Sequence, residues 1–231
     1  MIIDCISDLH GHYPKLEGGD LLIVAGDLTS DDRIPSWKAY YDWLQDQDYK
    51  KIVYIAGNHD NFLTHALSSH EADKLELDRG DPKMEYLCDS GTEFGGLRIW
   101  GSPWTKRLPG MNPNCMAFTV DTDEELAEKW ARIPEDVDIL VTHCPPFAIM
   151  DEVQSYYDKQ IEYVGSYSLL KKIEKIQPRL MVFGHIHECY GKMTAENLQI
   201  IKNLCPNTIF VNASHVNERY EPVNKPLRII L

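Results

Sequence analysis

Long hydrophobic runs are missing from this sequence of 231 residues. Its apolar runs reach about five residues, whereas a helix that crosses a membrane needs roughly 20, so we expect no membrane partner. The chain begins on a strand-like run, Met1 to Ile6, without the basic and apolar pattern of a secretory leader. These two absences predict a cytoplasmic location.

Positive charge is also scarce, because 23 Lys and Arg residues stand against 36 Asp and Glu residues and the net charge is -13. This is the wrong sign for a protein that binds a long stretch of nucleic-acid backbone, so we expect no extended nucleic-acid surface. A small anionic substrate is compatible with this charge if a bound cation supplies positive charge locally.

The sequence has six cysteines but no CxxC pair, which argues against a zinc knuckle or a thioredoxin-like site. It also lacks internal repeats, low-complexity tracts and Pro/Gly linkers. We therefore predict a single domain over residues 1–231.

Short runs of β-branched and apolar residues recur along the chain, and each ends in a polar cluster. We predict buried strands at Ile2–Ile6, Leu21–Ala25, Ile52–Ala56, Leu97–Trp100, Ile139–Thr142, Leu180–Phe183, Ile209–Val211 and Leu227–Leu231. Amphipathic stretches predict helices at Ser36–Gln47, Asp123–Ala131 and Ser166–Ile176, with Ser36 and Ser166 as N-caps. Glycines within 85–100 indicate a hairpin or a meander. Together these patterns predict an α/β fold, a sandwich of mixed sheets covered by helices.

Metal-type ligands follow five of these strands. In chain order they are Asp8 and His10, then Asp27, then Asn58, His59 and Asp60, then His143, and finally His185 and His187. Because the carboxyl ends of parallel strands meet at one edge of a sheet, a parallel arrangement would bring all five clusters together. The glycines before Asp27, Asn58 and His185 fit sharp turns that aim those side chains inward.

Each cluster alone is compatible with an ordinary turn or a surface histidine, but their joint occurrence at strand ends favours a metal site. Carboxylate, amide and imidazole ligands suit Mn²⁺, our first expectation, and also Fe²⁺/³⁺, Zn²⁺ or Ni²⁺, better than Ca²⁺. Seven ligand side chains are too many for one ion. Two ions that share one carboxylate fit this number and form the clamp used for in-line displacement at phosphorus.

In their order along the chain, these blocks resemble the signature of the calcineurin-like metallophosphoesterases: D-x-H, G-D, G-N-H-[DE], a histidine and G-H-x-H. The resemblance implies a four-layer αββα sandwich of two mixed sheets with a dinuclear centre at its rim. It implies that one metal is held by Asp8, His10, Asp27 and His187, and the other by Asp27, Asn58, His143 and His185, with Asp27 bridging.

Segments 100–104, 137–146 and 207–226 are similar to those of the small metallophosphoesterase-domain-containing proteins within this superfamily. Two residues depart from the superfamily pattern, since Cys144 and Cys189 lie where glycine is usual. Neither change removes a ligand.

A reaction follows as a hypothesis from this arrangement. Two cations bridged by Asp27 would lower the pKa of a water between them, and the resulting hydroxide would attack phosphorus in line. We assign His59, which is left out of the ligand set, as the general acid that protonates the leaving alkoxide, with Asp60 orienting its imidazole. Weaker candidates for substrate contact are Asn58, His12, Lys106, Arg107 and His215, whereas His65 and His70 are expected to be non-ligands.

The predicted function is a phosphodiesterase that acts on small substrates such as cyclic nucleotides. A phosphomonoesterase acting on nucleotides or other small phosphates stays open, because both reactions use the same attack on phosphorus. A non-catalytic metal-binding scaffold is disfavoured, because the expected ligands and the histidine of the G-N-H-[DE] block are all present.

Overall fold

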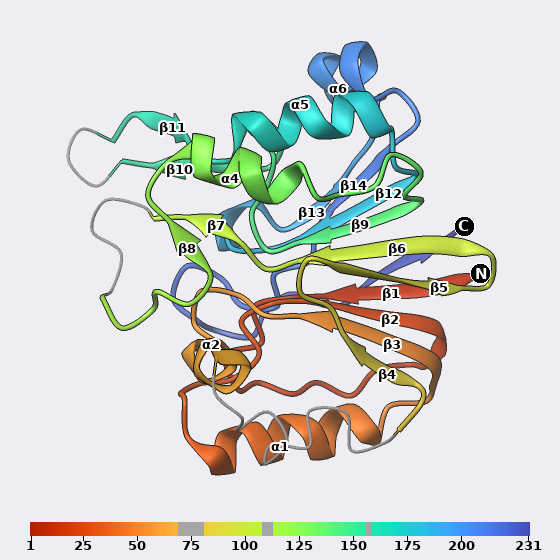
Figure 1. The fold of residues 1–231 in the computed structure, drawn as a ribbon, viewed down its shortest axis with the longest axis vertical. Helices are drawn as coiled ribbons and strands as arrows, with labels where there is room; N and C mark the ends of the chain where they lie inside the picture. The colour runs from red at the N-terminus through yellow and green to blue at the C-terminus, as the bar shows by residue number, and fades with distance from the viewer. Residues whose placement is uncertain (69–80, 108–112, 156–158) are drawn as a thin grey trace.

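Two β-sheets stack face to face at the centre of the structure, and helices cover their outer faces (Figure 1). This computed structural model describes residues 1–68, 81–107, 113–155 and 159–231. The layers run helix, sheet, sheet, helix, which confirms the predicted four-layer αββα sandwich.

The first sheet contains five strands in the order β15-β1-β2-β3-β4. Their bounds are β1 Ile2–Ile6, β2 Gly19–Ala25, β3 Tyr49–Ile55, β4 Met84–Tyr86 and β15 Leu227–Ile230. Strands β1 to β4 are parallel, whereas β15 pairs antiparallel with β1. The first and last strands of the described chain therefore lie side by side.

The second sheet contains six strands in the order β13-β14-β12-β9-β6-β5. Their bounds are β5 Ser90–Phe94, β6 Leu97–Ser102, β9 Ile139–Thr142, β12 Leu180–Phe183, β13 Gly191–Met193 and β14 Ile209–Asn212. The four inner strands are parallel, and the two edge strands are antiparallel to their neighbours. The predicted hairpin is confirmed between β5 and β6, where Gly95 and Gly96 form the turn with φ of +59° and +78°.

The inner strands are buried on both faces, because each sheet lies between the other sheet and a helix layer. Ile23 and Val53 of the first sheet share a buried cluster with Val141 and Val182 of the second. The next residue along β2, Val24, faces the opposite way and packs in the cluster that contains the buried side chains of α1. This double burial explains why the strands are continuous apolar runs in the sequence and not alternating ones.

The helices form the two outer layers (Figure 1). The first sheet is covered by α1 Ile34–Gln45 and α2 Asn61–Ser68. The second sheet is covered by α4 Asp123–Trp130, α5 Tyr167–Ile176 and α6 Gln199–Leu204.

The N-cap prediction is confirmed at Ser166 and wrong at Ser36. The Oγ atom of Ser166 accepts a hydrogen bond from the N–H of Leu169 at 3.1 Å, at the start of α5. Helix α1 begins two residues earlier than the predicted cap, after Arg33, with a proline in its first turn. Proline suits this position because its φ is already helical and its missing N–H is not needed there. Ser36 instead donates from Oγ to Oδ1 of Asp31 at 2.6 Å.

Short elements at the rim were not predicted from the sequence. They are β7 Thr105–Lys106, β8 Thr119–Val120, β10 Glu152–Gln154, β11 Ile161–Tyr163 and the 3-10 helix η1 His187–Cys189. Strands β7 and β8 pair with each other, as do β10 and β11. Within the described ranges, no helix combines the length and the apolar character that crossing a membrane requires.

Candidate metal centre

Side chains from five strand ends meet at one rim of the two sheets. Asp8, Asp27 and Asn58 follow the parallel strands β1, β2 and β3 of the first sheet. His143 and His185 follow the parallel strands β9 and β12 of the second sheet. The contacts described next show that the carboxyl ends of both sets of strands adjoin each other.

The carboxylate of Asp8 is fully buried and contacts residues from the far end of the chain. Both of its oxygens lie 3.1 Å from the N–H of His185, and Oδ1 lies 3.2 Å from Nε2 of His187. The Oγ atom of Ser214 donates a hydrogen bond to Oδ2 at 2.8 Å. Together with His10 and His187, Asp8 forms a group whose ligand atoms all lie within 4.8 Å of one another.

Asp27 lies between histidines that come from the two sheets. Its Oδ2 atom is 3.7 Å from Nε2 of His10 and 3.4 Å from Nε2 of His143. The same Nε2 atom of His143 lies 3.1 Å from Oδ1 of Asn58. One carboxylate oxygen thus faces two imidazole nitrogens, which is the position that a carboxylate shared by two cations needs.

The backbone is left-handed at four of the expected ligands. The φ angle is +51° at Asp8, +44° at His10, +54° at Asp27 and +70° at His185. Residues other than glycine adopt this conformation uncommonly, at a cost of order 1–3 kcal/mol each, and such residues concentrate at functional sites. Hydrogen bonds hold it here, since the N–H of Asp8 donates to the carbonyl of Gly26 and the N–H of His10 to that of Asp27.

Two glycines let the turns approach the carboxylates closely. A Cβ atom at Gly57 would lie 2.2 Å from Oδ1 of Asp27, and one at Gly184 would lie 2.1 Å from Oδ2 of Asp8. Neither position has room for a side chain. These glycines precede Asn58 and His185, so the close approach also places those two residues in the cluster.

Backbone carbonyls orient two of the histidine rings. Nδ1 of His143 lies 2.9 Å from the carbonyl oxygen of Ala25, and Nδ1 of His187 lies 3.1 Å from that of Asn217. Because a carbonyl oxygen only accepts hydrogen bonds, Nδ1 carries the proton and donates in both rings. Nε2 of each ring then faces the cluster, where its lone pair would bind a cation once Nε2 is deprotonated, as in metal-binding histidines whose other nitrogen is held by the protein.

Two further histidines supply unpaired donor atoms. Nε2 of His10 and Nε2 of His185 are buried and have no hydrogen-bond partner among the residues that the structure describes. Burial lowers the pKa of His10 to about 4 and that of His185 to about 3, so both rings are neutral at physiological pH. Buried polar atoms without partners are rare, and a cation bound by neutral imidazoles and carboxylates would satisfy them. The donor set therefore fits a metal centre.

Charge in the cluster is balanced between carboxylates and imidazoles. Burial alone would raise the pKa of Asp27, but the charges of His143 and His59 hold that pKa well below its usual range. Burial would lower the pKa of His143, yet the Asp27 carboxylate raises it to about 9. The buried carboxylate therefore stays ionised and provides a negative site for a cation.

His59 lies on the open side of the cluster, with 25% of its side chain exposed. Its Nε2 atom is 4.0 Å from Oδ2 of Asp27, and its N–H donates to Oδ1 of Asp27 at 2.9 Å. The sequence predicts that Asp60 orients the imidazole, but the structure gives the Asp60 carboxylate other partners. It accepts hydrogen bonds from the N–H of Gly57 at 2.7 Å and from the N–H of Leu28 at 3.0 Å. Asp60 therefore holds the turn on which His59 lies.

A cleft of about 530 Å³ opens beside the cluster. Of the weaker sequence candidates, His12 lines this cleft. Lys106 lies on β7, and the Nε atom of Arg107 forms an ion pair with Asp121 at 3.2 Å. Neither cation is among the described residues that line the cleft, so the structure does not support their contact with a phosphate there.

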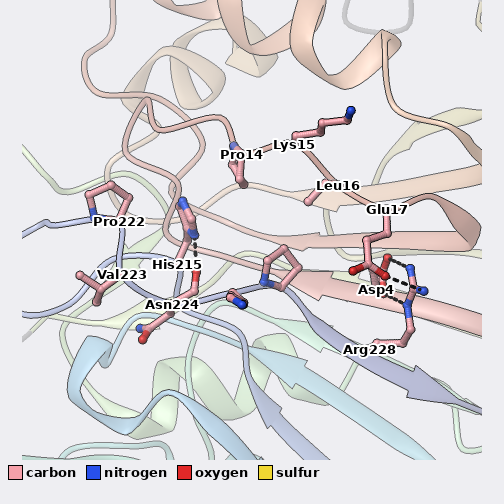
Figure 2. A pocket seen from close by; sticks show the side chains of 12 residues that line it. Asp4, Pro14, Lys15, Leu16, Glu17, His215, Pro222, Val223, Asn224 and Arg228 are labelled. Atoms are coloured by element: carbon pink, nitrogen blue, oxygen red, sulfur yellow. Dashed lines mark hydrogen bonds and ion pairs between the residues drawn. The ribbon is translucent and has the colours of Figure 1, made fainter.

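His215 lines a second pocket of about 490 Å³, between segments 14–17 and 222–226 (Figure 2). Its Nδ1 atom lies 2.7 Å from the carbonyl oxygen of Asn224. Asp4 and Arg228 lie on one side of this pocket (Figure 2). The predicted substrate contact of His215 would thus fall outside the cleft beside the cluster. The side chain of His65 and the whole of His70 lie outside the described residues.

Three residues that contact the cluster were missed by sequence reasoning, and all of them follow β14. Ser214 bonds to Asp8, and Asn217 bonds to His187. Tyr220 packs its ring near three of the histidines. One signal in the sequence marks this region, the similarity of segment 207–226 to the small metallophosphoesterase-domain-containing proteins. That similarity does not predict which residues contact the cluster.

Residues 1–189 match the family of calcineurin-like phosphoesterases. The human and mouse proteins called metallophosphoesterase domain-containing protein 1 are each 35% identical to this chain over 246 residues. These alignments cover 98% of this chain and 70% of each relative. The chain therefore belongs to the calcineurin-like phosphoesterase family, and its class of reaction is metal-dependent phosphoester hydrolysis.

Solved structures share the fold. Protein TT1561 of Thermus thermophilus superposes with a TM-score of 0.57 at 18% identity, covering 91% of this chain and 88% of that one. Purple acid phosphatase PPD1 from yellow lupin (Lupinus luteus) seeds superposes with a TM-score of 0.52 at 14% identity, covering 100% of this chain and 47% of that one. At these identities the likeness concerns the fold alone.

Proposed function

We propose that this protein hydrolyses small phosphodiesters, cyclic nucleotides among them, with two metal ions bound at the cluster. The residues that line the cleft favour a phosphodiesterase over a phosphomonoesterase. Asp31 and Asp32 line it, and among its described lining residues none is Lys or Arg. A phosphodiester has one negative charge, whereas a monoester has nearly two at pH 7. A cleft whose described lining has two aspartates and no Lys or Arg therefore disfavours the more highly charged monoester.

The seven side chains that meet at the rim supply the ligands for this proposal. One ion would be held by Asp8, His10, Asp27 and His187, and the other by Asp27, Asn58, His143 and His185. Ions bound there supply Lewis acidity toward the phosphate and its attacking water. We expect Mn²⁺ to support activity, because oxygen and imidazole donors both suit it.

His59 is proposed as the general acid. It borders both the cluster and the cleft, and its partly exposed ring can reach a bound ester. Asn58 and His12 are the proposed substrate contacts that border this same region. Asp60 contributes by holding the turn of His59, as its backbone hydrogen bonds indicate.

Hydrolysis of two activated esters tests the proposed function. Protein stripped with chelator and reconstituted with Mn²⁺ is expected to hydrolyse bis-p-nitrophenyl phosphate with a kcat/KM at least about tenfold above that for p-nitrophenyl phosphate. Asp27→Asn should abolish this turnover, and Asp121→Asn, a change at an exposed aspartate, should preserve it.

The other outcomes contradict the proposal in distinct ways. A higher kcat/KM for the monoester would assign the protein as a phosphomonoesterase. Absence of turnover on both esters, with two Mn²⁺ ions bound per chain, would assign it as a metal-binding scaffold.

A further inference from the structure

Tyr220 lies against the histidines of the metal cluster. Its ring centroid is 4.8 Å from that of His10, 5.3 Å from that of His187 and 6.2 Å from that of His59. The rings meet at interplanar angles between 61° and 88°. This edge-to-face geometry is favourable for aromatic rings and places the tyrosine at the boundary of the cluster.

The loop that carries Tyr220 is closed by its own hydrogen bonds. The side-chain oxygen of Asn217 accepts from the N–H groups of Arg219 at 2.9 Å and Glu221 at 3.0 Å. The N–H of Tyr220 donates to the carbonyl of Asn217, and Tyr220 has a left-handed φ of +61°. The same carbonyl accepts from Nδ1 of His187. The position of the tyrosine ring is therefore fixed by the fold and tied to a candidate ligand.

The ring of Tyr220 is also available to a ligand. The residue is 48% exposed and lines the cleft of about 530 Å³ beside the cluster. This volume lies within the range of small-molecule sites and would hold a nucleoside or an aryl group. Since none of the described lining residues is Lys or Arg, the cleft offers stacking on Tyr220 and hydrogen bonds from its polar side chains to the part of a substrate beyond its phosphate.

We propose that Tyr220 determines specificity by stacking on a flat aromatic ring, an aryl group or a nucleobase, carried by the non-leaving group of a phosphodiester. This proposal rests on the proposed function, because it assigns the substituent of the same ester. Stacking of a base on an aromatic side chain contributes enough to change affinity about tenfold or more.

Three esters with one leaving group test the proposal. Methyl, phenyl and thymidine 5′ esters of p-nitrophenyl phosphate all release p-nitrophenolate and differ in the non-leaving group. We expect kcat/KM to be about tenfold higher with a ring than with methyl, mainly through KM. Tyr220→Ala should remove this preference, whereas Tyr220→Phe should retain it.

The kcat/KM values of the three esters show which kind of ring is preferred. They also show whether Tyr220 determines specificity or only supports the histidines. A preference for the phenyl ester alone would assign an aryl group, and one for the thymidine ester a nucleobase. Tyr167→Ala, which removes a tyrosine exposed to 54% on α5, is the matched control and should keep the preference. An equal loss on the methyl and ring esters in Tyr220→Ala would show that Tyr220 only supports the histidines, and would overturn the proposal.

A binding measurement makes the inference independent of turnover. O-methyl phenylphosphonate and O-methyl methylphosphonate have one negative charge each and differ by the ring. Calorimetry on the Mn²⁺-loaded protein should give a Kd about tenfold lower for the phenyl compound, and Tyr220→Ala should equalise the two values. Equal Kd values in the unmodified protein would overturn the role of Tyr220 even if diesters are hydrolysed. A phenyl preference without any ester turnover would contradict only the proposed function.

Discussion

His59 differs from His143 and His187 because, within the part of the chain that the structure describes, no backbone carbonyl lies within hydrogen-bond distance of its ring. Its Nε2 atom is 4.0 Å from Asp27, beyond the range of a hydrogen bond, and its side chain is partly exposed. The ring is partly exposed and no hydrogen bond ties it to Asp27, which suits proton transfer to a leaving group better than permanent ligation.

His59→Ala tests this role. We expect kcat for a 3′,5′-cyclic nucleotide, which has an alkoxide leaving group, to fall about 10²–10⁴-fold, because general acid catalysis contributes that much. The loss on bis-p-nitrophenyl phosphate should be far smaller, since p-nitrophenolate leaves without protonation. Steady-state rates on both substrates measure this difference, with Mn²⁺ content determined in parallel. Equal losses on the two substrates at full Mn²⁺ content would rule out the general-acid role.

At the scale of residues, the sequence could predict the ligand candidates but not the residues that surround them. Asp27, Asn58 and His185 each follow a glycine and a buried run. The ligand-type residue and the glycine that its turn requires are therefore neighbours in the sequence. Ser214 and Tyr220 reach the cluster only because β14 ends beside β1, a contact between segments about 200 residues apart. Nothing in their immediate neighbours encodes that contact.

The turn after β12 packs directly against a carboxylate of the metal cluster. Gly184 lies there, and a Cβ atom would collide with the Asp8 carboxylate and with Ser7 at 2.1 Å. We expect Gly184→Ala to weaken Mn²⁺ binding at least about tenfold, because Asp8 must move to make room for the methyl group. Calorimetric titration of Mn²⁺ into chelator-stripped protein measures the change.

Gly96→Ala is the matched control for this substitution. Gly96 lies in the turn between β5 and β6 with a φ of +78°, and among the described residues other than its two chain neighbours no atom lies within 4 Å of an added Cβ. The control should lose about 1 kcal/mol of unfolding free energy from backbone strain and keep its Mn²⁺ affinity. An unchanged Mn²⁺ affinity in Gly184→Ala would mean that Asp8 is not needed to hold the metal.

At the scale of elements, the burial of a strand determines whether its sequence pattern predicts it. Seven of the eight predicted strands have mostly buried side chains, because two-sided burial leaves an apolar run that stands out, whereas β15 is apolar in sequence but buries only one of its four residues. Strands β10 and β11 have three residues each with exposed or half-buried side chains, and they are specified by their pairing. Helix α1 begins before its predicted cap, with Arg33 as N-cap and a proline in its first turn in place of a capping serine.

At the scale of the whole molecule, one buried carboxylate joins distant strands (Figure 2). Asp4 on β1 accepts two hydrogen bonds from the guanidinium of Arg228 on β15, each at 2.8 Å. It also accepts a hydrogen bond from the hydroxyl of Tyr49 on β3. The first, third and last strands of the first sheet are therefore tied together through one side chain.

Tyr49→Phe tests the contribution of this tie. Losing the buried hydroxyl should lower the free energy of unfolding by about 1 kcal/mol. Denaturant unfolding followed by circular dichroism measures the change, and Tyr163→Phe, at a residue 48% exposed, should leave stability unaltered. We also propose that residues 1–231 form one domain, so both proteins should unfold in a single transition. Two separate transitions would contradict the single domain.

The hydrogen bond between His187 and Asn217 has a thermodynamic consequence. If His187 holds a cation through Nε2, as proposed, its Nδ1–H would be more polarised and would bind the Asn217 carbonyl more strongly, and that carbonyl belongs to the loop that presents Tyr220. Metal binding and stabilisation of that loop would then be linked equilibria. Linkage is reciprocal, so a substrate that stabilises the loop would tighten metal binding by the same factor by which the metal tightens substrate binding. Metal retention during turnover would then depend on which ester the protein is hydrolysing.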